Sequence, residues 1–80
     1  MNFTWDPRKA ISNARKHGVT SEEATTVFAD LLALAIQDEA HEERTLLLGL
    51  SGRSRVLLVV HLELDDDTVR LISARRATSH

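Results

Sequence analysis

The chain has 80 residues, of which 42% are hydrophobic and 28% are charged, with a formal net charge of −2 at pH 7. This length predicts a single domain, residues 1–80, with a small core. No apolar run approaches the roughly 18 residues that span a membrane, the N-terminus has no signal-peptide core, and cysteine is absent. We therefore expect a soluble protein of the cytoplasm.

Charge is segregated along the chain. Residues 1–18 contain four basic side chains and one acidic one, whereas residues 19–43 contain seven acidic side chains and no lysine or arginine. The remaining residues contain six arginines and four acidic side chains. Because each region has its own balance, the net charge says little about binding partners.

The N-terminal residues predict a short edge strand followed by a helix. Asn2 to Trp5 has the alternation of an extended segment. Asp6 is a preferred N-cap and Pro7 is favoured in a first helical turn, so a helix is expected over residues 7–16, ending before Gly18. Its basic side chains lie off the apolar stripe: Arg8, Lys9, Arg15 and Lys16.

A second, shorter helix is predicted over residues 21–28. Thr20 and Glu23 have the spacing of a capping box, in which each side chain accepts a hydrogen bond from the backbone of the other residue. Ala24, Val27 and Phe28 supply the buried face of this helix.

Four strands are predicted after Asp30, where β-forming residues recur with a period of two. The segments are Leu32 to Gln37, Arg44 to Leu50, Arg55 to Leu64 and Thr68 to Ala77. Their connections are short and polar, which makes neighbouring strands antiparallel. The expected fold is therefore α+β, with two N-terminal helices packed on one face of an antiparallel sheet of four to five strands.

The third of these strands is apolar on both sides. Val56 to Leu62 lacks the alternation of a half-solvated strand, so it is expected at the centre of the sheet with both faces covered. Two helices can cover one face, and these 80 residues supply no third helix for the other. An uncovered apolar face predicts a homo- or hetero-oligomer.

The last predicted strand carries three arginines, Arg70, Arg75 and Arg76. The planar guanidinium group matches phosphate oxygens, so this cluster indicates a surface that contacts nucleic acid. The alternative is an ordinary solvated strand end, with Arg70 paired to the acidic run Asp65 to Asp67 across the turn.

Short motifs recur in the order and spacing of a known family along nearly the whole chain. They are Phe3-Thr4-Trp5-Asp6-Pro7 with Lys9, Asn13, Lys16-His17-Gly18-Val19, Glu22-Glu23-Ala24, Val27-Phe28 with Asp30, His41, Glu43-Arg44, Gly49-Leu50-Ser51 and Ile72-Ser73-Ala74-Arg75-Arg76-Ala77-Thr78. In these motifs the chain resembles the BrnT family of bacterial toxins, the ribonuclease halves of BrnT/BrnA toxin–antitoxin pairs. The resemblance implies a RelE-like fold, in which a C-terminal helix usually follows Ala77-Thr78, and these 80 residues are expected to lack that helix.

The resemblance also implies a function. A BrnT-like protein is expected to be a metal-independent endoribonuclease that cuts RNA, inhibits translation and is neutralised by a BrnA-like antitoxin. It uses no cofactor and meets DNA only through the antitoxin. The alternative is a catalytically incomplete toxin-like module that binds its antitoxin and contributes to repression of its operon.

RNA cleavage of the RelE type requires a proton acceptor, a proton donor and cations around the reacting phosphate. By resemblance, the cations best placed around that phosphate are Arg44, Arg53, Arg75 and Arg76. Glu43 and His41 are the candidates for proton exchange, and His61 is a weaker candidate. The groups expected to contact the RNA backbone are Arg15, Lys16 and Arg70. We expect the four arginines of the first set to converge on one concave surface, with Lys16 or Arg15 at its rim.

The other histidines and the aromatic residues have structural interpretations. His17 precedes the helix end and is expected to cap or pack beneath that helix, and His61 in a central strand is expected in the core. Phe3 and Trp5 could stack on an RNA base, but anchoring of the first strand is the expected use.

His41 and the nearby Glu39, Glu42 and Glu43 could also suggest a metal site. The chain has no cysteine and no His-x-x-x-His spacing, so no metal is expected.

Overall fold

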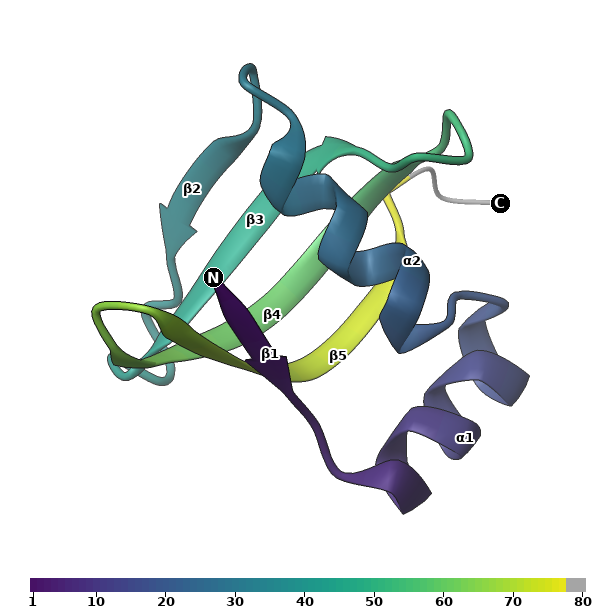
Figure 1. Cartoon of the computed structure of the whole chain (residues 1–80), viewed down its shortest axis with the longest axis horizontal. Coiled ribbons are helices and arrows are strands. Elements are labelled where there is room, and N and C mark those ends of the chain that lie inside the picture. The colour runs from purple at the N-terminus through teal and green to yellow at the C-terminus, as the bar shows by residue number, and fades with distance from the viewer. Residues whose placement is uncertain (78–80) are drawn as a thin grey trace.

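The computed structural model describes residues 1–77 and has an α+β architecture with two α-helices and a five-stranded sheet (Figure 1). Its elements in chain order are β1 (Asn2–Thr4), α1 (Pro7–His17), α2 (Ser21–Thr26), the 3₁₀ helix η1 (Val27–Ala29), β2 (Leu34–Gln37), β3 (Arg44–Leu50), β4 (Val56–Asp65) and β5 (Thr68–Arg76). The sheet order is β1-β5-β4-β3-β2. No helix among residues 1–77 is long and apolar enough to cross a membrane.

The helices begin and end at the capping residues that the sequence shows. The Asp6 carboxylate accepts a hydrogen bond from the backbone N–H of Arg8 (2.9 Å), and α1 ends at Gly18, which has a φ of 70°. Glycine adopts this left-handed conformation without strain because it has no Cβ. The Thr20 hydroxyl accepts from the backbone N–H of Glu23 (3.1 Å) and caps α2. α2 then tightens into η1 instead of continuing as an α-helix.

One strand pair departs from the antiparallel sheet that the sequence predicts. β1 pairs with β5 in parallel, with Asn2 opposite Thr68 and Thr4 opposite Arg70, so the sheet is mixed. Short connections force antiparallel pairing, but nearly the whole chain separates β1 from β5, and a connection of that length fixes no strand direction. The other three pairs are antiparallel as expected.

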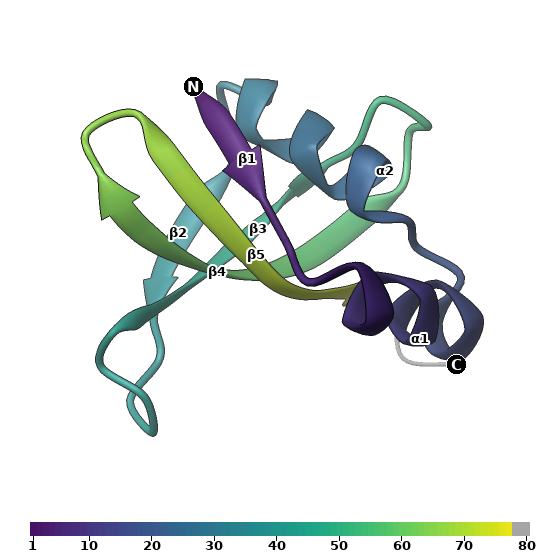
Figure 2. The ribbon, with the colours of Figure 1, turned by 60° about the horizontal axis from the view of Figure 1, so that its bottom comes forward.

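The two helices meet the sheet in different ways. In Figure 2, α2 lies across one face of the sheet, which we call the covered face, whereas α1 lies beside the end of β5. The Asn13 side chain donates to the Ala74 carbonyl (2.8 Å) and accepts from the Ala74 N–H (3.2 Å). Because β1 pairs only three residues of β5, Asn13 satisfies backbone groups further along that strand. The expectation of both helices on one face therefore holds for α2 and not for α1.

The core lies between α2, η1 and the covered face. Phe3 and Trp5 pack against it, and the rings of Phe3 and Phe28 meet edge-on with centroids 5.0 Å apart. Both residues thus anchor the first strand, as expected. The buried hydrophobic residues are Val19, Ala24, Val27, Leu57, Val59, Val69, Leu71 and Ala74.

A buried carboxylate joins α2 to the turn between β3 and β4. Glu23 accepts hydrogen bonds from the Ser51 hydroxyl (2.7 Å) and from Nε of Arg55 (2.9 Å), and Arg55 also donates to the Gly18 carbonyl (2.9 Å). The hydrogen bond from Arg55 is the main reason that the pKa of Glu23 lies below its ordinary value. The predicted capping box is only half formed, because Thr20 caps α2 while the Glu23 carboxylate turns inward to Arg55.

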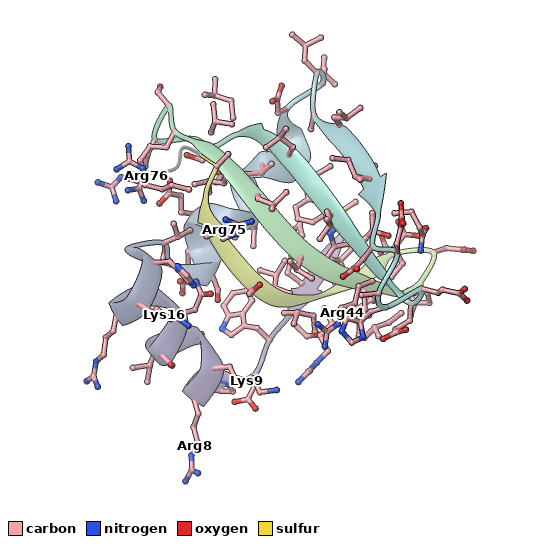
Figure 3. All side chains as sticks on the ribbon, turned by 180° about the vertical axis from the view of Figure 1, so that it is seen from behind. Arg8, Lys9, Lys16, Arg44, Arg75 and Arg76 are labelled. Atoms are coloured by element: carbon pink, nitrogen blue, oxygen red, sulfur yellow. The ribbon has the colours of Figure 1, made fainter. Side chains whose placement is uncertain are left out.

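The opposite face of the sheet, which we call the open face, carries aliphatic side chains. Figure 3 views the sheet from this side, and no helix crosses it among the residues drawn. Strand alternation and register place these residues there: Leu34, Ile36, Leu46, Leu48, Leu50, Val56, Leu58, Val60 and Leu62. The described residues therefore leave the second face uncovered and apolar, as the sequence predicts.

Candidate functional site

Most basic side chains make no ion pair with another described residue. Within residues 1–77, the only Lys or Arg side chains paired with a carboxylate are Arg53 and Arg55, and both pair with Glu23. The alternative of an Arg70 ion pair with the acidic turn is not realised, since Asp67 pairs with the N-terminal amino group (3.2 Å) instead. The remaining basic residues are Arg8, Lys9, Arg15, Lys16, Arg44, Arg70, Arg75 and Arg76.

The first group of candidate residues lies where β3 begins, and we call it the loop-end group: His41, Glu43, Arg44 and Arg70. Arg44 and Arg70 pair with Leu62 from its two sides, so they share one row across the open face. His41 and Glu43 lie in the exposed connection that leads into β3. Nδ1 of His41 lies 3.9 Å from a carboxylate oxygen of Glu43.

The second group lies at the other end of the sheet, and we call it the turn-end group: Arg15, Lys16, Arg53, Arg75 and Arg76. Arg75 and Arg76 end β5, and the Arg53 guanidinium in the β3–β4 turn lies 3.9 Å from the Glu23 carboxylate. Arg15 and Lys16 belong to the last turn of α1, which packs beside β5. Figure 3 shows Lys16 on the same side of the molecule as Arg75 and Arg76.

The four arginines expected on one concave surface do not converge. Arg44 lies in the row of Leu62 and Arg75 in the row of Leu58, so roughly 13 Å of β4 separates the two rows. Figure 3 shows Arg44 far from Arg75 and Arg76. The reason is topological. Since β3 and β5 both run antiparallel to β4, the start of β3 and the end of β5 lie at opposite ends of the sheet.

The two groups offer different chemistry. The loop-end group combines two arginines with a histidine and a carboxylate, side chains that can exchange protons. The turn-end group supplies cations, and its neighbouring carboxylate, Glu23, is kept ionised by Arg55. Among residues 1–77, no three His, Asp or Glu side chains are grouped so that they could hold a metal ion.

His61 lies in the core, as its strand context predicts. Its side chain is 3% exposed, and its ring meets the Phe28 ring edge-on with centroids 4.9 Å apart. Burial lowers the pKa of His61. Its Nδ1 has no hydrogen-bond partner among the described residues. His61 is therefore a core residue out of reach of RNA, while His17 lies partly buried in the last turn of α1.

Two contacts that hold α1 and α2 in place were not predicted from the sequence. No spacing rule pairs Asn13 with Ala74, because the two residues are 61 positions apart. The sequence spacing does predict that Glu23 is buried, because Glu23 precedes Val27 by four residues and adjoins Ala24 on the buried side of α2. A carboxylate on that side of a helix requires a cationic partner, and Arg55 supplies it.

The fold and these two groups define a small α+β protein with an apolar sheet face and, at both ends of the sheet, arginines that have no carboxylate partner within residues 1–77. A family model described as "Ribonuclease toxin, BrnT, of type II toxin-antitoxin system" matches residues 5–80. The chain therefore belongs to the BrnT family of ribonuclease toxins, whose type II systems pair each toxin with an antitoxin.

A solved structure shows the same fold. The crystal structure of the ribonuclease toxin BrnT from Brucella abortus superimposes with a TM-score of 0.79 and 21% sequence identity, covering 99% of each chain. At this identity the likeness shows a shared fold. A comparison with curated proteins finds no match.

Proposed function

We propose that this chain is an endoribonuclease that acts without a metal ion: it cuts RNA, inhibits translation and is neutralised by a cognate antitoxin. The observation that supports this most directly is the set of arginines that make no ion pair within residues 1–77, in a chain with 12 acidic and 10 basic residues. A guanidinium group already bound to a carboxylate must give up that partner before it binds a phosphate. Arg44, Arg70, Arg75 and Arg76 have no such partner among the described residues.

The loop-end group is our candidate for the chemistry. The RNA 2′-hydroxyl would pass its proton to Glu43 or His41 and attack the adjacent phosphorus, while the other group returns a proton to the departing 5′-oxygen. One P–O bond forms and one breaks, which leaves a 2′,3′-cyclic phosphate and a 5′-hydroxyl. Arg44 and Arg70 would offset the negative charge that develops on the phosphorane oxygens.

The turn-end group is our candidate for holding the rest of the RNA. Its lysine and arginines can neutralise flanking phosphates, an interaction that supplies affinity without reading base sequence. Arg75 also lies on the open face, in the row of Leu58, so one strand of RNA could contact both groups. This division of roles replaces the single concave surface expected from the sequence.

The test is cleavage of total RNA by the purified chain in the presence of EDTA. We expect the double variant Arg44→Ala/Arg70→Ala to cleave about a hundredfold more slowly or worse, since each lost contact to developing charge has about that effect. Arg75→Ala/Arg76→Ala should mainly weaken RNA binding. Arg8→Ala is the control, because Arg8 also makes no ion pair within residues 1–77 but lies in the first turn of α1, away from both groups (Figure 3). Unchanged cleavage by both double variants would remove these arginines from the mechanism.

A second candidate function is the catalytically incomplete module that binds its antitoxin and contributes to operon repression. The observation that favours it is the position of His41 and Glu43, whose side chains are exposed and 3.9 Å apart, not enclosed in a pocket that tunes proton transfer. In that case the wild-type chain would leave RNA intact in EDTA, yet would still tighten the binding of its antitoxin to operator DNA in a gel-shift assay.

A further inference from the structure

The open face carries a contiguous set of aliphatic side chains that are partly exposed, a pattern that marks an interaction surface. Its apolar residues cover three adjacent strands, β2, β3 and β4, and they remain accessible at the margins: Leu34 is 58% exposed, Leu50 48% and Val56 45%. Three strands span about 10 Å between the outer two, which is close to the diameter of one α-helix.

Arginines border this apolar surface along β5. The register forms one row from Arg75 through Leu58 and Leu48, and another from Arg70 through Leu62 to Arg44. Ser73 lies in the row between them, opposite Val60. The open face therefore has an apolar strip beside a cationic margin, and none of these arginines pairs with a carboxylate among residues 1–77.

This pattern argues against two other occupants of the apolar strip itself. RNA gains little from the strip, because aliphatic side chains offer no aromatic ring on which a base could stack. A second copy of the chain would cover the strip, but the strand rows of this face contain a single acidic residue, Asp65, which lies opposite Thr68. At least one of Arg70 and Arg75 would then be partly desolvated without a carboxylate partner, which is unfavourable.

We propose that the open face binds one amphipathic helix of the antitoxin, with its apolar stripe on β2 to β4 and acidic residues on the flank that faces β5. The rows of Arg70 and Arg75 lie roughly 13 Å apart along the strand direction, which corresponds to about eight or nine residues of helix. The two acidic positions should therefore be about two turns apart on that flank.

This inference rests on the proposed function, which supplies the antitoxin as the partner. It also explains physically how the antitoxin would neutralise the ribonuclease. A helix in this position covers Arg44, Arg70 and Arg75, so RNA and antitoxin compete for the same cations. Neutralisation then requires no change in the shape of the toxin.

The first test compares two exposed aliphatic residues of similar accessibility. Leu34 on the open face is 58% exposed and Ile11 on α1 is 56% exposed. We expect Leu34→Glu to weaken binding of the cognate antitoxin by at least about tenfold, as loss of a buried interface anchor does, and Ile11→Glu to change it less than about threefold. Circular dichroism melting of both variants confirms that each is folded. Equal affinities for Leu34→Glu and the wild-type chain would overturn the proposal.

The second test separates this inference from the proposed ribonuclease activity. Leu34 belongs to neither group of candidate catalytic residues, so Leu34→Glu should cleave RNA at the wild-type rate and yet escape inhibition by the antitoxin. If neither protein cleaves RNA, the ribonuclease proposal fails while the binding measurement still decides the docking surface. If both cleave and both are inhibited equally, the docking surface is wrong and the ribonuclease proposal stands.

Charge reversal tests the acidic flank. Arg70→Glu/Arg75→Glu should bind the antitoxin at least about tenfold more weakly, whereas Arg8→Glu should bind nearly as the wild-type chain does. Sedimentation velocity of the chain without antitoxin tests the rival occupant. A dimer that Leu34→Glu dissociates, together with unchanged antitoxin affinity, would overturn the proposal and identify the open face as a contact between copies.

Discussion

Gly49 occupies a position in β3 where no side chain fits. A Cβ atom there would lie 2.9 Å from side-chain carbons of Ala33 and Val27, and 3.0 Å from the Asp30 carboxylate. Real Cβ atoms almost never come so close to other atoms, so η1 and the chain after it would have to move away from the sheet. The glycine is needed here for close packing and not for an unusual backbone angle.

We expect Gly49→Ala to lower the free energy of unfolding by about 1–3 kcal/mol, the usual effect of overpacking a close contact. Gly52→Ala is the matched control, because its new Cβ would meet only Thr26, at 3.5 Å. Urea denaturation measures both variants. Equal stability of the two would contradict the close approach of β3 to η1.

His61 makes the stability of the fold depend on pH, and the burial of His61 determines the direction of that dependence. Burial lowers its pKa in the folded protein below the ordinary value of 6.5, so the unfolded chain binds this proton more readily than the folded one. Its contribution to stability is therefore complete above pH 6.5 and is lost as the pH falls below that value towards the folded-state pKa.

The comparison variant is His61→Leu, which cannot titrate. We expect the melting temperature of the wild-type chain to fall more steeply between about pH 7 and about pH 5 than that of His61→Leu, because all other titrating groups are common to both proteins. Parallel pH profiles would contradict a buried, neutral His61.

At the scale of elements, Glu23 and Arg55 connect three segments that are distant in sequence. The end of α1, the first turn of α2 and the β3–β4 turn all meet at this ion pair. Removing one charge leaves the other poorly compensated. Because the pKa of Glu23 is lowered in the folded state, the stabilisation is present above its ordinary pKa of 4.5 and is lost as the pH falls through the lower folded-state value.

We expect Glu23→Gln to lower the urea midpoint of unfolding clearly at pH 7, and Glu22→Gln to leave it nearly unchanged. Glu22 is the adjacent residue of α2, but it is exposed and makes no ion pair within residues 1–77. The difference in urea midpoint between the two variants should shrink in strong acid, where the side chains of Glu22 and Glu23 are protonated in any protein that retains them. Similar midpoints at pH 7 would show that the cluster does not hold these segments together.

Local patterns predicted the elements well because their causes are local. The caps at Asp6 and Thr20 set the helix starts, and the period-two runs set four strands to within two residues at each end. The direction of β1 and the position of α1 were not predictable in this way. They depend on pairing with β5 and on the contact of Asn13 with Ala74, which join opposite ends of the chain.

The candidate site was predicted as a set of residues but not as an arrangement. Motif resemblance identifies Arg44, Arg75 and Arg76 without saying how far apart they lie. Strand order alone would have separated them, since β3 and β5 run in the same direction and the arginines stand at the start of one and the end of the other.

In the whole molecule, the two faces of the sheet differ in composition. The covered face holds the core and includes His61, while the open face combines an apolar strip with arginines that have no carboxylate partner within residues 1–77. A chain of this size has a small core, and an uncovered strip reduces stability further. Binding of a partner to the open face should therefore raise the melting temperature, by an amount that grows with partner concentration.

The most direct test of the account is the chemical identity of the RNA ends that the purified wild-type chain produces in EDTA. We expect a 2′,3′-cyclic phosphate on one fragment and a 5′-hydroxyl on the other, with both products lost when Arg44 and Arg70 are replaced by alanine and when saturating antitoxin is present. Intact RNA after incubation with the wild-type chain would contradict the ribonuclease proposal. Fragments that carry a 5′-phosphate would contradict the attack by the 2′-hydroxyl on which the role of the loop-end group depends.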